Sequence, residues 1–217
     1  MSNEDQLQAI QEIRSMMNKS SRFLSLSGMS GVIIGALAIC CAFYMHYTVT
    51  SYNEMHGTSF NYVTILLHDN HFNLYLSIKY GIISATLLLV SLAIGFLLTY
   101  RKAKKHGESV WDETAWRVVK SLFVPLTVGG LVCIAFIYYG VFYFIAPMML
   151  IFYGFALYNA SKYTLSDIYS LGLIDMALGL LGLMFLDLGL LFWTLGFGVM
   201  HIVYGIAMHY KYDMKRA

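Results

Sequence analysis

The chain has 217 residues, of which 59% are hydrophobic and only 12% are charged; its mean hydropathy is +0.64 and its formal net charge is +2. A water-soluble domain of this size cannot bury so much apolar surface, so the composition excludes a soluble globular protein and indicates one that lies in a lipid bilayer. The basic residues are spread over several short segments, so no nucleic-acid-binding surface is expected.

The first 22 residues are polar and charged, so they do not form a cleavable signal peptide. Ser2 and Asp5 fit a capping box, and apolar residues recur downstream at helical spacing. These apolar residues are Leu7, Ile10, Ile13 and Met17. The pattern predicts a cytoplasmic amphipathic helix over residues 1–22 that lies on the headgroups or folds over the bundle; a docking site for a soluble partner is the alternative.

Four uncharged or nearly uncharged runs follow. The first two, 23–47 and 80–100, are each long enough for one crossing of a hydrocarbon core about 30 Å thick. The run 121–161 is too long for one helix and must turn back, with Gly140 at the turn. The last run turns at Asp187–Gly189 and ends near Tyr210. We therefore predict an all-α membrane bundle of six helices in three hairpins over 23–210, followed by a tail over 211–217.

Lysine and arginine in the short connections predict the orientation, because these residues concentrate on the cytoplasmic side. Under this topology only Lys79 lies on the outer side. The basic residues on the opposite side are Arg14, Lys19, Arg22, Arg101, Lys102, Lys104, Lys105, Arg117, Lys120, Lys162, Lys211, Lys215 and Arg216. Both ends of the chain are therefore expected in the cytoplasm.

The outer connection between the first two spans contains His56, His68 and His71 beside Asp69. Such side chains can bind zinc or copper, but there is no second clear pair, so we interpret the segment as a solvated loop without a metal. The three cysteines lie inside spans, which argues against a disulfide framework. They are Cys40, Cys41 and Cys133.

Small residues recur along the first span and the last two spans at spacings of four and seven. This pattern predicts faces at which helix backbones approach closely. The residues are Ser27, Gly28, Gly31 and Gly35 in the first span, and Gly172, Gly179, Gly182, Gly189 and Gly196 in the last hairpin. Pro125 and Pro147 are expected to kink their helices, and the aromatic-rich third and fourth spans either line a pocket or form packing and an interfacial belt.

Asp175 and His201 are polar residues inside the last two spans. With the turn near Asp187, both lie about 20 Å from it at about 1.5 Å per residue, which places them at equal depth within the hydrocarbon. We expect them to be neighbours that share a hydrogen bond, directly or through one water. The pair either pins two helices together or forms a proton-linked or solute-binding site.

The segments Ser21–Gly31, Ala160–Asp167 and Gly189–Gly205 resemble a family of uncharacterised six-span bacterial inner-membrane proteins. The resemblance covers nearly the whole chain and implies the bacterial cytoplasmic membrane, but no activity, ligand or site residue. The glycine-rich last hairpin is also similar to membrane proteins of the HdeD type.

We interpret the chain as a non-enzymatic protein that binds or transports a small solute or ion within the bundle. The alternative is a structural, sensory or accessory subunit that packs against a membrane partner or against a second copy of itself. The spans contain no His-Glu-x-x-His pair and no Gly-x-Ser-x-Gly elbow, which disfavours an enzyme. No cofactor is expected, because His46 and His201, the candidates for haem ligation, belong at different depths.

Overall fold

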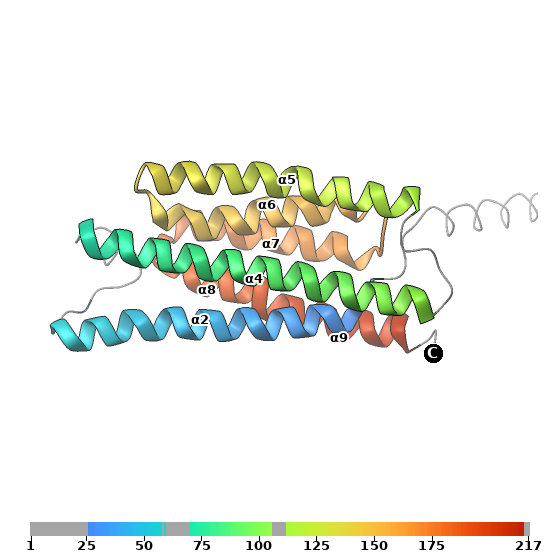
Figure 1. The fold of residues 1–217 in the computed structure, drawn as a ribbon, viewed down its shortest axis with the longest axis horizontal. Coiled ribbons are helices and arrows are strands. Elements are labelled where there is room, and N and C mark those ends of the chain that lie inside the picture. Colours follow the sequence, from blue (N-terminus) through green and yellow to red (C-terminus); the bar gives the residue numbers. More distant parts are fainter. Residues whose placement is uncertain (1–25, 58, 60–69, 106–111, 215–217) are drawn as a thin grey trace, which may run out of the picture.

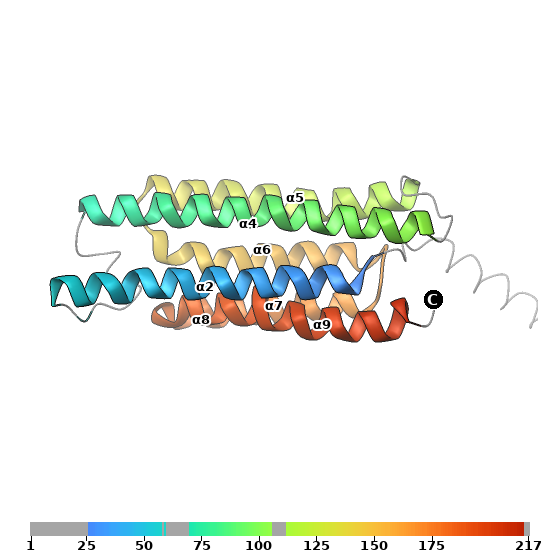
Figure 2. The same cartoon turned by 60° about the horizontal axis from the view of Figure 1, so that its bottom comes forward.

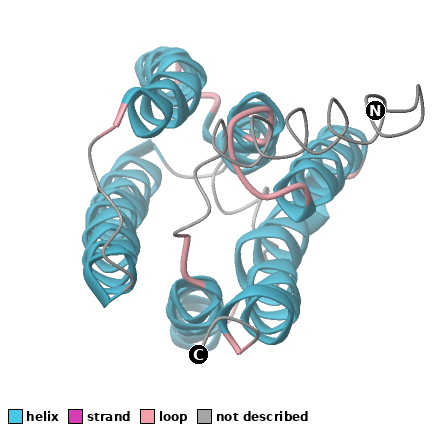
Figure 3. Cartoon of the chain, turned by 90° about the vertical axis from the view of Figure 1, so that its right-hand side faces the viewer, coloured by secondary structure: helices cyan, strands magenta, loops and turns pink. Residues whose placement is uncertain are grey.

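A computed structural model describes residues 26–57, 59, 70–105 and 112–214. The predicted amphipathic helix over 1–22 and the outer-loop residues His68 and Asp69 lie outside these ranges. Within them all regular structure is helical, and six helices are long and apolar enough to cross a membrane (Figure 1). The chain therefore forms the predicted all-α bundle. Viewed end-on, the helices run along one common direction (Figure 3).

The first, second, third and fifth spans are single α-helices, whereas the fourth and sixth contain short 3-10 or π-helical segments. The spans are α2 (Gly28–His56), α4 (Asn70–Lys105), α5 (Glu113–Tyr138), η1 with α6 (Phe142–Phe144 and Ile145–Ala160), α7 (Asp167–Met184), and η2, α8, η3, α9 and η4 in succession (Leu186–Leu188, Gly189–Trp193, Thr194–Met200, His201–Met208 and His209–Asp213). The last helix thus continues to Asp213, beyond the expected boundary of the tail at residue 211.

The second and third hairpins turn where the sequence predicts, whereas the first span continues past its expected end near Tyr47 to His56. Gly140 separates α5 from η1 with a φ of 70°, a left-handed conformation that a side chain disfavours. Gly57 ends α2 in the same way with a φ of 62°. The 3-10 helix η2 makes the turn between α7 and α8. Pro147 is the third residue of α6, where the backbone N–H that proline lacks would have no partner within the helix. The expected kink in the middle of this helix is therefore not required.

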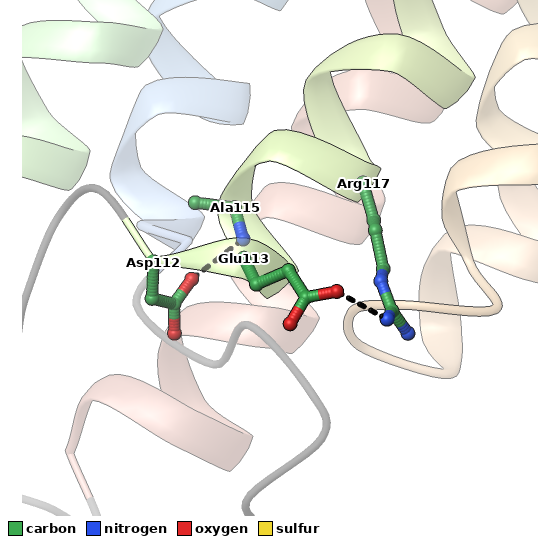
Figure 4. A network of polar contacts seen from close by, with 4 residues as sticks. All are labelled: Asp112, Glu113, Ala115 and Arg117. Carbon is green, nitrogen blue, oxygen red and sulfur yellow. Dashed lines mark hydrogen bonds and ion pairs between the residues drawn. The ribbon is translucent and has the colours of Figure 1, made fainter.

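The start of α5 is fixed by local hydrogen bonds. Asp112 is the N-cap residue, and its carboxylate accepts a hydrogen bond of 2.6 Å from the backbone N–H of Ala115 (Figure 4). One turn further on, Arg117 donates to Glu113 over 2.6 Å at the exposed surface. These contacts stabilise the start of α5 at Glu113.

A close crossing joins the first and last spans. A β-carbon built on Gly35 would lie 2.6 Å from the carbonyl oxygen of Gly198, and one on Gly31 would lie 3.2 Å from the Cα atom of Gly205. These two spans therefore touch backbone to backbone, and Figures 1 and 2 both show α2 alongside α9. Glycine permits this approach because it has no side chain. Close packing of this kind stabilises helix association in lipid, where there is no hydrophobic drive for helices to associate.

A second close crossing joins α6 to α7. A β-carbon on Gly172 would lie 2.7 Å from the carbonyl oxygen of Gly154, and one on Gly179 would lie 2.8 Å from that of Pro147. At the crossing of the first and last spans, Gly28 approaches Gly205, as Gly31 does. The close crossings are therefore between the first and sixth spans and between the fourth and fifth.

The remaining small residues differ in what they contact. A β-carbon on Gly182 would meet Pro147 at 3.2 Å, whereas one on Gly189 would meet nothing within 4 Å. Gly196 faces Leu150 and Asp175. Ser27 is the N-cap residue of α2, and its carbonyl accepts a hydrogen bond from the Ser30 hydroxyl. Small residues at regular spacing thus belong to more than one kind of contact.

The second span, α4, is the most loosely held. Among its described side chains only Tyr80, Thr99 and Ala103 are buried. Tyr80 donates to the carbonyl oxygen of Met45 on α2 over 3.1 Å, and α4 packs mainly against α2. Between these contacts the side chains in the middle of α4 are exposed or half-buried, and none is fully buried.

Candidate binding cavity

A cavity of about 430 Å³ lies beneath the middle of α4. Its walls come from α2, α4, α5, α6 and the last span, and among the described residues they include no aspartate, glutamate, lysine or arginine. Cavities of 300–1,000 Å³ with mainly apolar walls and a few placed polar groups are typical of small-molecule sites. The polar side chains of this lining include Tyr80, Ser84, Ser91, Tyr153 and His201.

One wall of the cavity is a cluster of aromatic rings. Trp193, Phe197 and His201 follow one another at a spacing of four on the last span, so they share one face of the helix. Tyr153 on α6 packs against this face, with its ring 5.0 Å from that of Phe197 and 5.3 Å from that of His201. We call these residues the aromatic wall.

The indole at the outer end of the aromatic wall is held by small neighbours. Trp193 is only 3% exposed and packs against Ala38 and Ala42 of α2 and Ala146 of α6. Alanine at these positions makes room for the large ring. Trp193 is therefore almost fully covered by protein, and it also lines the cavity.

His201 carries the polar contact of the wall. Its Nε2 lies 2.8 Å from the hydroxyl oxygen of Tyr153, and its Nδ1 lies 2.9 Å from the carbonyl oxygen of Gly196. A carbonyl oxygen only accepts, so Nδ1 must carry a hydrogen. An imidazolium here would have no bonded counter-ion within the hydrocarbon, so the contacts favour the neutral ring, whose Nε2 accepts the Tyr153 proton.

The helix is irregular at this point. Thr194–Met200 is π-helical and ends immediately before His201. π-helical turns are rare and often occur at functional sites, because they rotate the following side chains relative to a regular helix. Here the π-helical segment holds the Gly196 carbonyl within reach of the imidazole five residues further on.

Asp175 lies behind the aromatic wall and not in the cavity. Its side chain is fully buried, and neither carboxylate oxygen has a hydrogen-bond partner among the described residues. A β-carbon on Gly196 would lie 2.9 Å from its Oδ1, so only glycine leaves room for the carboxyl group there. A charged carboxylate without a partner is very costly in hydrocarbon, which favours the neutral acid.

No direct hydrogen bond joins Asp175 to His201 within the described part of the chain. The Asp175 carboxyl group lies beside the Cα atom of Gly196, and the His201 imidazole lies beside the Gly196 carbonyl oxygen. Both imidazole nitrogens are hydrogen-bonded to groups other than Asp175. Counting residues from the turn places two residues at the same depth and leaves their rotation about the helix axis undetermined. The imidazole is turned toward α6, where it meets Tyr153.

The cavity is open where α4 and α5 face each other. Both helices contribute lining residues, yet they barely contact one another. Leu88 on α4 and Ile134 on α5 line the cavity and are still 46% and 62% exposed. In a membrane these exposed residues face lipid, so the opening leads into the bilayer.

The other candidate residues lie apart from the cavity. His56 sits at the exposed end of α2 and stacks on Tyr52. No group of three or more metal-binding side chains occurs in the part of the chain that the structure describes. Cys40, Cys41 and Cys133 are free thiols, and of these only Cys133 lines the cavity.

Comparisons with protein-family models, curated proteins and solved structures gave no match. Sequence reasoning placed Tyr153 in an aromatic stripe but did not pair it with His201. The spacing of four from Trp193 to Phe197 to His201 is the signal that identifies the wall, because it puts three rings on one helix face.

Proposed function

We propose that this membrane protein is a non-enzymatic binding protein for a small, membrane-dissolved solute, which it holds in the cavity against the aromatic wall. The observation that carries the proposal is the hydrogen-bonded pair of Tyr153 and His201 on the wall of a mainly apolar cavity of about 430 Å³. A placed polar contact in such a site orients a ligand, while the apolar walls supply most of the binding free energy.

The cavity favours an organic solute over an inorganic ion. The described part of its lining has no carboxylate and no cationic side chain, and Asp175 lies outside it. An ion that left water for this space would lose its hydration without gaining charged ligands. We therefore place the protein among binding proteins or carriers of lipophilic molecules and not among ion channels.

The orientation in the membrane is part of the proposal. The excess of lysine and arginine at one end of the helices favours a cytoplasmic location for both termini, in a bacterial inner membrane. With that orientation the last helix begins on the outer side, and the aromatic wall extends from there toward the cytoplasm.

Trp193 provides a direct assay of binding. In a variant with Trp111→Phe and Trp116→Phe it is the sole tryptophan, and its low exposure allows a quencher to reach it only from the cavity. 1-Bromododecane, added to the protein in micelles, should quench Trp193 with a saturable dependence on concentration. Quenching that rises without saturation would indicate partition into the micelle and would contradict the proposal.

Two glycines provide a matched pair of variants. A β-carbon on Gly130 or on Gly95 would meet nothing within 4 Å, but only Gly130 lines the cavity. Gly130→Phe should therefore fill the cavity and abolish saturable quenching, whereas Gly95→Phe should preserve it. An equal response of the two variants would remove the cavity as the binding site and leave the accessory role as the better interpretation.

A further inference from the structure

The hydrogen-bonding pattern of the aromatic wall defines the chemistry of the ligand more narrowly. We infer that the solute is an uncharged, single-chain amphiphile whose polar end is an O–H donor, and that Tyr153 accepts this hydrogen bond inside the membrane. The inference rests on the proposed function, because it assigns a ligand class to the same cavity.

The depth of the polar contact requires an uncharged head group. His201 lies 13 residues beyond Leu188, the last residue of the turn, which corresponds to about 20 Å along the helix. The hydrocarbon core is about 30 Å thick, so Tyr153 and His201 lie within it. A phosphate, carboxylate or ammonium head group would lose its hydration there, and the cavity lining offers no charge to replace that hydration.

The direction of the hydrogen bonds then requires a donor. The Gly196 carbonyl fixes the hydrogen of His201 on Nδ1, so Nε2 accepts the proton of the Tyr153 hydroxyl. That proton is committed, but the hydroxyl oxygen still has acceptor capacity. An alcohol O–H satisfies this oxygen, whereas an ether, ester or ketone oxygen would face another acceptor.

The route of entry favours an aliphatic chain. The cavity opens toward lipid between α4 and α5, where the exposed lining residues are leucine, isoleucine, alanine and glycine. A flexible chain can enter through such an opening without leaving the bilayer. Its end then lies against Tyr153, and the rest of the chain lies along the middle of α4 and α5.

The test is a competition series in the protein with Trp193 as its sole tryptophan. Displacement of 1-bromododecane is measured with 1-dodecanol, with its methyl ether and with dodecane. A neutral hydrogen bond contributes about 0.5–1.5 kcal/mol, so we expect 1-dodecanol to displace the probe at a concentration roughly 3- to 10-fold below that of the ether.

The outcomes separate this inference from the proposed function. If none of the three compounds displaces the probe and quenching is unsaturable, the proposed function itself fails. If the probe binds saturably but the alcohol and ether displace it equally, or the ether displaces it better, the proposed function stands and the donor head group is wrong.

A double variant, Tyr153→Phe with His201→Leu, connects the preference to the aromatic wall. It removes both acceptors of the pair, so the alcohol and the ether should displace the probe equally, with helical content by circular dichroism as the folding control. A persistent preference for the alcohol would place the head group elsewhere, such as at the Ser84 and Ser91 hydroxyls that also line the cavity, and would overturn the assignment. The competition series on the intact pair decides the inference if the double variant does not fold.

Discussion

The contact between the first and last spans predicts a large difference between two glycine-to-alanine variants. A β-carbon on Gly35 would lie 2.6 Å from the carbonyl oxygen of Gly198 and 3.0 Å from the backbone nitrogen of Ile202. These are backbone atoms, which cannot rotate away as the end of a side chain can. Gly35→Ala must therefore push the two helices apart, and overpacking of this kind costs about 1–3 kcal/mol.

Gly95→Ala is the matched control, because a β-carbon there meets no atom within 4 Å. Both variants gain about 0.8–1.0 kcal/mol of helix propensity, so this gain cancels when the two are compared. We expect Gly35→Ala to have a free energy of unfolding about 1–3 kcal/mol below that of Gly95→Ala. The assay is unfolding by sodium dodecyl sulfate in mixed micelles, followed by circular dichroism. Equal midpoints for the two variants would refute the backbone contact.

Three further predictions concern single side chains. Asp175→Asn should change the free energy of unfolding by less than about 1 kcal/mol because the carboxyl group has no hydrogen-bond partner among the described residues; a loss above about 3 kcal/mol in detergent-induced unfolding would mean that an ionised, paired carboxylate had been removed. Asp112→Ala should cost about 1 kcal/mol through loss of the N-cap of α5, and Glu113→Ala should cost less because its ion pair with Arg117 is exposed; the reverse order in the same assay would contradict the capping role. After the native cysteines are replaced by serine, His56→Cys should react with a membrane-impermeant thiol reagent in intact cells and Lys162→Cys should not; labelling only at residue 162 would invert the orientation.

The spans and turns could be predicted from the sequence because they depend on composition along the chain. Long uncharged runs have to be helical in lipid, and a 41-residue run from Ser121 to Ser161 has to turn back. Gly140 is the glycine near the middle of that run, and it adopts the left-handed conformation that the turn requires. Each of these properties is local, so no knowledge of neighbouring helices was needed.

The partners of the helices could not be predicted, because spacing identifies a face without identifying what covers it. Gly31 and Gly179 have the same small-residue signature, yet one contacts the last span and the other contacts α6. Gly189 follows the same spacing and contacts nothing within 4 Å. The loose packing of α4 was also hidden, because its composition is as apolar as that of the other spans.

The candidate site was predicted in part. Hairpin geometry placed Asp175 and His201 at one depth, and both lie beside Gly196. The hydrogen-bond partner of His201 depends on rotation about the helix axis, which the π-helical segment before it alters. Its partner Tyr153 lies 48 residues away on α6, a separation that no local pattern encodes.

The most direct test of the central claim is an experimental structure of the protein in a lipid nanodisc that contains a long-chain alcohol. We predict elongated density in the cavity that enters between α4 and α5 and ends within hydrogen-bonding distance of the Tyr153 hydroxyl. A structure in which α4 closes against α5 and protein side chains fill the space beside Tyr153 and His201 would contradict the claim that this bundle binds a solute from the membrane.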